Sequence, residues 1–218
     1  MTLVDLTHPL TPAAHVPEGF PRVEQRLLAT HARDGLQDTW LELSMHAGTH
    51  LDAPLHAVPD GEDIAMIALE RIIGPAVAWR CPCVEPRAID ARELASAYPP
   101  LQSGDRVLIA TGWERFYACA DRYRVHPHLS DDAAAWLVAR GATVVGIDTP
   151  TPDLAGPLRP EGFDHPVHHA LLERGVLIVE NLANLERVAV RRFRLLLCQI
   201  PVACSDGAPV RAIAELDD

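Results

Sequence analysis

The stretch DDAAAWLVARGATVVGI, residues 131–147, decides the fold class, because it places a helix directly before a buried strand. Ser130 stands at the expected N-cap of this helix, and Gly141 follows its last residue. TVVGI, at 143–147, is short and largely apolar, as expected of a strand that is covered on both faces. The stretch therefore predicts a helix over 131–140 and a strand immediately after it.

The same order of elements recurs on both sides of this stretch. RVLIAT at 106–111 predicts a buried strand before it, and PVHHALLER at 166–174 predicts a helix after it that ends at Gly175. Further strands are expected at VLIV, 176–179, and FRLLLCQI, 193–200. Because helices alternate with strands, this half of the chain predicts an α/β domain with parallel pairing.

The first eighty residues are richer in strands than in helices. Strands are expected at LVDLT (3–7), VEQRLLA (23–29), WLELSM (40–45) and PAVAWRC (75–81). A capping box of Asp90 and Glu93 then opens a short helix, ARELASAY. The strand-rich part predicts additional sheet packed on, or curled around, the α/β part. We therefore expect the α/β class, as one domain over 1–218, with a central mixed sheet of the swivelling β/β/α kind and flanking helices.

Charge and hydropathy exclude several classes of function. The chain has 218 residues, 48% of them hydrophobic, and 30 acidic against 19 basic residues, for a net charge of −11. An acidic surface repels phosphate, so we expect a small-molecule substrate and no nucleic acid. No apolar run approaches the roughly 18 residues of a membrane span, so no membrane partner is expected. The N-terminal segment lacks the basic start and apolar run of a secretory signal, which predicts a cytoplasmic protein.

The cysteines form no recognisable framework. They are odd in number and lack paired C-x-x-C spacing: Cys81, Cys83, Cys119, Cys198 and Cys204. This pattern favours neither a disulfide scaffold nor a zinc ribbon. Cys81 and Cys83 are expected to be reduced thiols in the core.

HAGTHLDAPLH, residues 46–56, carries the strongest chemical signal. Its even positions hold the polar and turn residues His46, Gly48, His50, Asp52, Pro54 and His56, whereas its odd positions are mostly apolar. This alternation is typical of an extended segment with two different faces. A single histidine is more often a core or surface residue than a ligand. Three histidines and an aspartate on one face, however, predict a metal site.

A straight strand cannot bring these histidines to one ion. At about 3.3 Å per residue, the Cβ atoms of His46 and His50 would lie roughly 13 Å apart, and one ion requires them within roughly 10 Å. Gly48 lies midway and permits unusual backbone angles, so we expect the chain to bend there. Asp52 then completes a set of two histidines and one carboxylate that leaves room for water. His56 is the candidate acid/base.

The complete pattern H-x-G-T-H-x-D-x-P-x-H resembles the signature of the cyclase family, which includes bacterial kynurenine formamidases and isatin hydrolases. The resemblance extends over nearly the whole chain. It continues through DLTHPLTP (5–12), DRVLIATGW (105–113), LSDDAAAWLVARGATVVGIDT (129–149) and HHALLERGVLIVENL (168–182).

This resemblance implies one or two divalent ions, manganese or zinc, and a second histidine and glutamate that are twelve residues apart. His168 and Glu180 match that spacing. The implied metal ligands are then His46, His50, Asp52, His168 and Glu180. Asp52 would be shared between a first ion on the two motif histidines and a second ion on His168 and Glu180. His56 matches the acid/base of the family.

The resemblance also implies a metal-dependent hydrolase that cleaves an amide-like bond with metal-activated water, acting on an aryl formamide such as N-formylkynurenine. A cyclic amide such as isatin, or a lactone, demands the same attack and stays open as a substrate. The alternative from another class is a non-catalytic metal-binding domain. A homodimer or homotetramer is implied as well.

Some polar and aromatic residues receive no site role. Asp148, at the end of TVVGI, is expected to be structural, and Trp113 and Phe116 are expected to pack rather than to recognise a substrate. Three histidines stay unassigned: His126, His128 and His165. His128 departs from the small residue expected in relatives, which leaves the substrate preference open.

Overall fold

One large sheet of mixed direction organises the molecule. The computed structural model describes residues 1–217. The strands of this sheet are β1 (Thr2–Asp5), β4 (His50–Asp52), β5 (Ile73–Arg80), β7 (Arg106–Ala110), β9 (Val144–Ile147), β10 (Leu177–Glu180), β11 (Arg191–Gln199) and β12 (Gly207–Leu216). Within the described residues their order is β1-β12-β11-β5-β7-β9-β10-β4, and β12 also pairs with β4. This additional pairing closes the sheet into a barrel-like ring.

The middle of the sheet is parallel and its flanks are antiparallel. β5, β7, β9 and β10 run in the same direction, whereas β4, β11 and β12 pair antiparallel with their neighbours. The predicted α/β class, with a central mixed sheet and parallel pairing in the second half, is confirmed. β12 is a strand that we did not predict. Its buried residues alternate along GAPVRAIAEL, but most are alanines, which have a low strand propensity.

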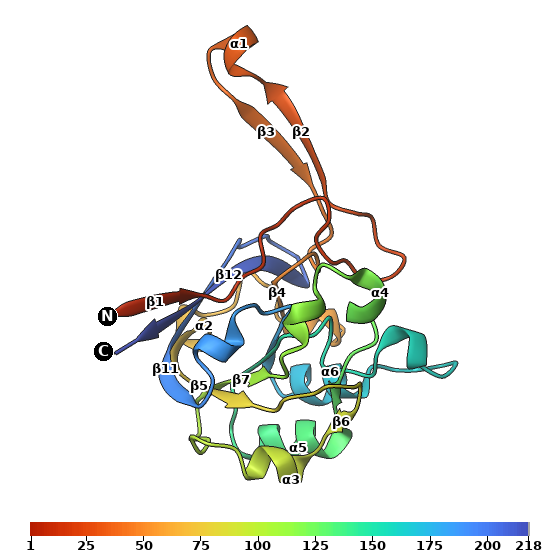
Figure 1. Cartoon of the computed structure of the whole chain (residues 1–218), viewed down its shortest axis with the longest axis vertical. Coiled ribbons are helices and arrows are strands. Elements are labelled where there is room, and N and C mark those ends of the chain that lie inside the picture. The colour runs from red at the N-terminus through yellow and green to blue at the C-terminus, as the bar shows by residue number, and fades with distance from the viewer. Residues whose placement is uncertain (218) are drawn as a thin grey trace.

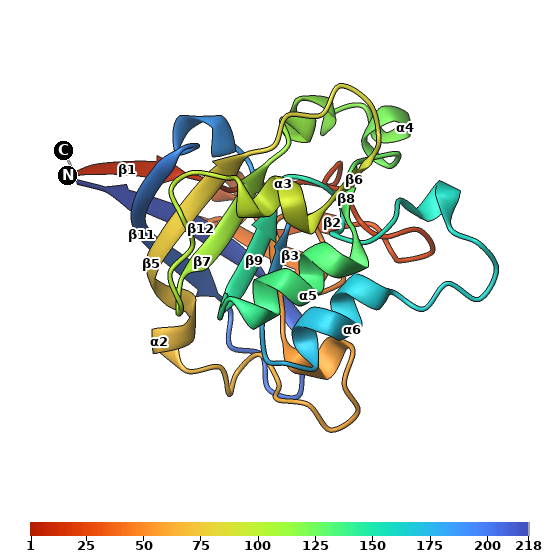
Figure 2. The ribbon, with the colours of Figure 1, turned by 90° about the horizontal axis from the view of Figure 1, so that it is seen from below.

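Three helices cover the outer face of the parallel strands. They are α3 (Ala91–Ala95), α5 (Asp131–Ala139) and α6 (Pro166–Leu172), and they lie on one side of the sheet in Figure 2. Asp90 caps α3, because its Oδ1 accepts the N–H of Glu93 at 2.8 Å, but the Glu93 carboxylate binds Arg87 instead of completing the capping box. Ser130 was predicted to cap α5, and it occupies the N-cap position, but its side chain makes no capping hydrogen bond. Its hydroxyl donates to the carbonyl of Ile89 instead.

The sheet separates two hydrophobic clusters. Alternate residues of β5 illustrate the division: Ala76 and Ala78 lie in the enclosed cluster of the ring, whereas Val77 and Trp79 pack toward the helices. The enclosed side is crowded, and a Cβ on Gly146 would lie 2.5 Å from the Leu108 side chain. Small residues on this side therefore allow the ring to close.

A hairpin of β2 (Glu24–Ala29) and β3 (Asp38–Glu42), with α1 (His31–Asp34) at its tip, projects away from the ring (Figure 1). We expected these strands to pack on or around the α/β part, and this expectation was wrong for β2 and β3. Most residues of both strands are exposed, including Leu27, Leu28 and Leu41.

The remaining elements are short. They are η1 (Pro54–His56), α2 (Leu69–Ile72), β6 (Ala88–Ile89), η2 (Trp113–Phe116), α4 (Ala120–Tyr123), β8 (His128–Leu129), η3 (Gly156–Leu158) and η4 (Leu185–Arg187). No helix in residues 1–217 has both the length and the apolar character needed to cross a bilayer.

Candidate metal centre

The motif segment bends where the sequence predicts. Gly48 has a φ of +63°, in the left-handed region that favours glycine, and the chain turns there before β4 begins at His50. The ring centroids of His46 and His50 consequently lie 5.1 Å apart. A straight strand would have separated their Cβ atoms by roughly 13 Å.

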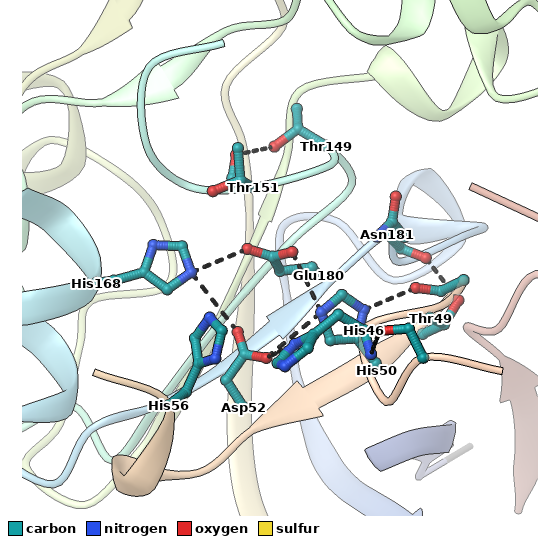
Figure 3. Close-up of polar contacts among 12 residues, drawn as sticks. His46, Thr49, His50, Asp52, His56, Thr149, Thr151, His168, Glu180 and Asn181 are labelled. Atoms are coloured by element: carbon teal, nitrogen blue, oxygen red, sulfur yellow. Dashed lines mark hydrogen bonds and ion pairs between the residues drawn. The ribbon is translucent and has the colours of Figure 1, made fainter. Parts of the chain in front are cut away.

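A first group of ligand atoms forms around this bend. His46 Nδ1 lies 2.9 Å from Asp52 Oδ1, and His50 Nε2 lies 3.4 Å from the same oxygen (Figure 3). All three residues are buried, and one potential ligand atom from each lies within 4.8 Å of the others. This geometry is compatible with one shared cation.

A second group forms because β4 pairs with β10. The register places Glu180 directly opposite His50, and α6 brings His168 to the same point. His168 Nε2 lies 3.2 Å from Glu180 Oε1 and 3.7 Å from Asp52 Oδ2. Asp52 therefore presents one oxygen to each group. The structure brings together all five residues that the family resemblance implied as ligands, and their roles as ligands stay a prediction.

Hydrogen bonds on the far side of two imidazoles aim their other nitrogens at the carboxylates. His50 Nδ1 donates to the carbonyl of Gly48 at 2.8 Å. His168 Nδ1 donates to Asp153 Oδ2 at 2.5 Å, and Asp153 also accepts the backbone N–H of His168. Each ring thus turns Nε2 toward Asp52 and Glu180. Such outer contacts fix the tautomer of histidine ligands in metal sites.

The electrostatics of the site residues are those of tightly coupled opposite charges. Burial disfavours a charged His50, but Asp52 and Glu180 outweigh this effect and raise the pKa of His50 to about 10. For His46, burial is likewise outweighed by Asp206 and Asp52, and its pKa rises to about 9. Burial opposes ionisation of Glu180 as well, yet the histidines lower its pKa to about 2. The paired carboxylates thus favour positive charge at these nitrogens, which a metal ion would also supply.

Unsatisfied polar atoms provide a test of whether a metal fits. Among the described residues, His50 Nε2, Asp52 Oδ2 and Glu180 Oε1 are buried without a hydrogen-bond partner. A buried polar atom without a partner costs free energy, and these three atoms lie within the two groups around Asp52. A divalent cation in each group would satisfy them, and these nitrogen and oxygen donors suit zinc or manganese. The residues fit a metal.

His56 lies beside these groups rather than within them. It belongs to η1, its side chain is 29% exposed, and its ring centroid lies 5.6 Å from that of His168. Its Nδ1 contacts Asp206 Oδ2 at 2.9 Å. This position matches an acid/base that reaches substrate from outside the metal ligands, and the role itself stays a prediction.

The residues without a predicted role are mostly structural. Asp148 is fully buried and accepts hydrogen bonds from the backbone of Thr111, Gly112 and Trp113, so the structural expectation holds. Trp113 packs in the cluster under the helices. His126 is also buried and donates from Nδ1 to the carbonyl of Pro127, and burial lowers its pKa to about 4.

His128 and His165 differ in how far they are exposed to solvent. His128 is half-buried on β8, and burial lowers its pKa. His165 is exposed, and its ring centroid lies 5.8 Å from that of His168. Neither residue belongs to the two groups around Asp52.

Sequence reasoning missed two carboxylates of the site, Asp153 and Asp206. Both lie in loops, and each contacts a histidine of the site. Neither stands at a fixed spacing from the motif. The only local signal is that Asp206 precedes Gly207 in a turn-like segment after an apolar strand.

Comparisons with known proteins identify the family of this chain. The family model Cyclase, described as "Putative cyclase", matches residues 4–154. The kynurenine formamidase of Salinibacter ruber is 33% identical over 221 residues, which cover 98% of this chain and 97% of that protein. A predicted metal-dependent hydrolase from Bacillus stearothermophilus has a TM-score of 0.79 at 27% identity, covering 98% of this chain and 97% of that one.

An isatin hydrolase bound to the product analogue thioisatinate has a TM-score of 0.89 and covers 99% of this chain and 92% of that one. At 21% sequence identity, this likeness shows the fold alone. The family match and the formamidase likeness extend over most of the chain, and the donor groups around Asp52 could hold a metal ion. The chain belongs to the cyclase family of hydrolases.

Proposed function

We propose that this protein hydrolyses an aryl formamide such as N-formylkynurenine, with one or two zinc or manganese ions held by the two groups around Asp52. The observation that carries the proposal is that Asp52 presents an oxygen to each group while His56 stands beside both. The 33% identity to a kynurenine formamidase over nearly the full length supports this choice of substrate.

The residues divide the chemistry between binding and proton transfer. His46, His50 and Asp52 would hold one ion, and Asp52, His168 and Glu180 the other. A bound divalent ion supplies Lewis acidity, which polarises a carbonyl oxygen and acidifies water. Asp52 and Glu180 supply the negative charge that retains the cations in a buried place.

His56 performs the proton transfer in this proposal. With Nδ1 occupied by Asp206, its Nε2 takes a proton from the attacking water, whose oxygen forms the new C–O bond to the formyl carbon. The C–N bond breaks, and the same proton passes from Nε2 to the departing arylamine nitrogen. The products are formate and the free amine. No serine or cysteine nucleophile is required.

Isatin is the second candidate substrate, favoured by the likeness in fold to isatin hydrolase. It is a cyclic amide, so the same attack would open its ring. Purified protein loaded with Zn²⁺ or Mn²⁺ is to be assayed with N-formylkynurenine, isatin and simple aryl esters by absorbance. We expect the largest kcat/KM with N-formylkynurenine. Faster turnover of isatin would favour the second candidate, and stoichiometric metal without turnover of any substrate would favour a non-catalytic metal-binding domain.

We also propose a homodimer or homotetramer, in which a second copy covers the β2–β3 hairpin. An isolated two-stranded hairpin is at best marginally stable in water. On this hairpin Leu27 is 54% exposed and Leu41 42% exposed, and both lie on one face. On the other face, the Arg26 guanidinium of the same hairpin covers the Trp40 ring, 4.0 Å from its centroid. We therefore propose that a second copy buries the face with Leu27 and Leu41.

The cellular site that we propose is the cytoplasm. Within the described residues the five cysteines form no disulfide, and Cys81 and Cys83 are buried, free thiols. Unpaired thiols are typical of proteins in reducing compartments.

A further inference from the structure

One carboxylate oxygen links a metal-ligand candidate to the proposed base. Asp206 Oδ2 lies 2.9 Å from His46 Nε2 and 2.9 Å from His56 Nδ1. The two rings are neighbours, with centroids 4.2 Å apart. Asp206 belongs neither to the sequence motif nor to the two groups around Asp52, and its side chain is 41% exposed.

The backbone holds Asp206 in this position. Its carbonyl accepts the N–H of Ala53 at 2.9 Å, which ties it to the residue after Asp52. The next residue, Gly207, opposes Asp52 in the β12–β4 pairing. A Cβ on Gly207 would lie 2.9 Å from the carbonyl oxygen of Leu51 and 3.1 Å from the His46 ring, so glycine is required for this close approach. The carboxylate is thus placed by the closure of the ring.

The contacts of Asp206 hold a proton on one nitrogen of each ring. A carboxylate only accepts hydrogen bonds, so His46 donates from Nε2 and His56 donates from Nδ1. His46 Nδ1 faces Asp52 Oδ1 at 2.9 Å, and a cation bound there would replace the proton at this nitrogen and leave the Nε2–H form. His56 is left with Nε2 as a free lone pair for proton transfer. The same carboxylate therefore selects the tautomer that each neighbour needs.

We propose that Asp206 is a positioning residue that orients a metal ligand and the catalytic base together. In its part concerning His56, this inference rests on the proposed function. In its part concerning His46, it rests only on geometry. A partner of this kind typically contributes about 10–100-fold to metal affinity or to activity.

The test compares Asp206→Asn and Asp206→Glu with Asp164→Asn, a control at an exposed aspartate whose nearest charged partner is the exposed His169, 3.8 Å away. Calorimetric titration with Zn²⁺ should show an affinity about 10–100-fold lower for Asp206→Asn at unchanged stoichiometry. Asp206→Glu should recover part of that affinity, and Asp164→Asn should match the natural protein. Loss of one whole equivalent of Zn²⁺ would instead make Asp206 a ligand and overturn the proposal.

Long-range ¹⁵N–¹H NMR spectra of the zinc-loaded protein provide a readout that needs no substrate. We expect His56 to be the Nδ1–H tautomer in the natural protein and a mixture in Asp206→Asn. Identical histidine tautomers in both proteins would overturn the inference. In the formamide assay, Asp206→Asn should lower kcat with little change in KM. If the proposed substrate is wrong, neither the natural protein nor any variant will turn over the formamide. The Zn²⁺ affinity and the histidine tautomers then still decide the role of Asp206.

Discussion

His50 Nε2 and Glu180 Oε2 lie 3.3 Å apart, although 130 positions in the sequence separate the two residues. They meet because β4, from the first half of the chain, pairs antiparallel with β10 at the end of the parallel strands. The histidine motif alone therefore supplies three of the five candidate ligands. The pairing of β4 with β10 adds Glu180, α6 adds His168, and Asp52 is shared between the two groups.

This arrangement predicts different outcomes for Asp52 and His56. Asp52→Ala should lose bound metal and activity together, because Asp52 contributes an oxygen to each group. His56→Ala should retain metal but lose about 10²–10⁴-fold in kcat, the usual contribution of a general acid/base. Metal per chain by mass spectrometry and steady-state kinetics would check both outcomes. His169→Ala, which removes an exposed histidine paired with Glu173, is the control. Equal metal content and equal activity in the two site variants would contradict the assignment.

Gly48 predicts a link between backbone conformation and metal binding. Gly48→Ala should destabilise the fold by about 1–2 kcal/mol, because its φ of +63° is unfavourable for a residue with a Cβ. It should also weaken metal binding, since relaxation of the bend moves His46 away from His50. Gly19→Ala is a matched control, with a φ of +85° and, apart from its chain neighbours, no atom of residues 1–217 within 4 Å of the added Cβ. Both variants should have a lower melting temperature, and only the Gly48 variant should lose affinity for Zn²⁺.

The motif was predictable because its chemistry is local. His46, His50 and Asp52 lie within seven positions, and the requirement for a bend between them follows from strand geometry. Gly48 confirms that bend. His168 and Glu180 were different, because helix–turn–strand spacing alone does not say which strand lies opposite β4. Only the family resemblance implied them, and the structure then placed them beside Asp52.

The remaining misses have a common physical cause. Asp153 and Asp206 act through contacts that depend on how loops return after distant strands, and single loop carboxylates carry no pattern. β12 was missed because its enclosed side is built from alanines, which fit the crowded ring but lack strand propensity. The hairpin was misplaced because strand-like composition predicts a strand without saying what that strand packs against.

Glu114 predicts a pH dependence of stability that is separate from the metal site. Burial and the nearby Asp148 raise its pKa to about 7, and its Oε2 lacks a hydrogen-bond partner among the described residues. A carboxyl with a raised pKa binds its proton more tightly in the folded state, so the free energy of unfolding falls as pH rises from about 4.5 to about 7. Because the group is partly exposed, we expect a loss of about 1 kcal/mol rather than the full shift.

Urea unfolding of the natural protein and Glu114→Gln at pH 5 and pH 8 would measure this effect. The variant should lose less stability between the two pH values, because the amide does not titrate. Glu161→Gln, at an exposed position, controls for the general loss of one negative charge. Parallel pH profiles for the natural protein and the Glu114 variant would assign the dependence to other groups.

The hairpin predicts that its leucine face governs assembly. Leu27 lies opposite Thr39, and Leu41 opposite Gln25, so the two leucines share one face of the two-stranded ribbon. Leu27→Asp combined with Leu41→Asp should place two charges on the surface that a second copy would bury, and burial of unpaired charges is strongly unfavourable. Light scattering after size exclusion should show the natural protein as a dimer or tetramer and the double variant as a monomer. Leu69→Asp, at a leucine on α2 that is 63% exposed, should leave the mass unchanged. A natural protein that is monomeric at micromolar concentration, or a double variant with unchanged mass, would show that a second copy does not cover this face.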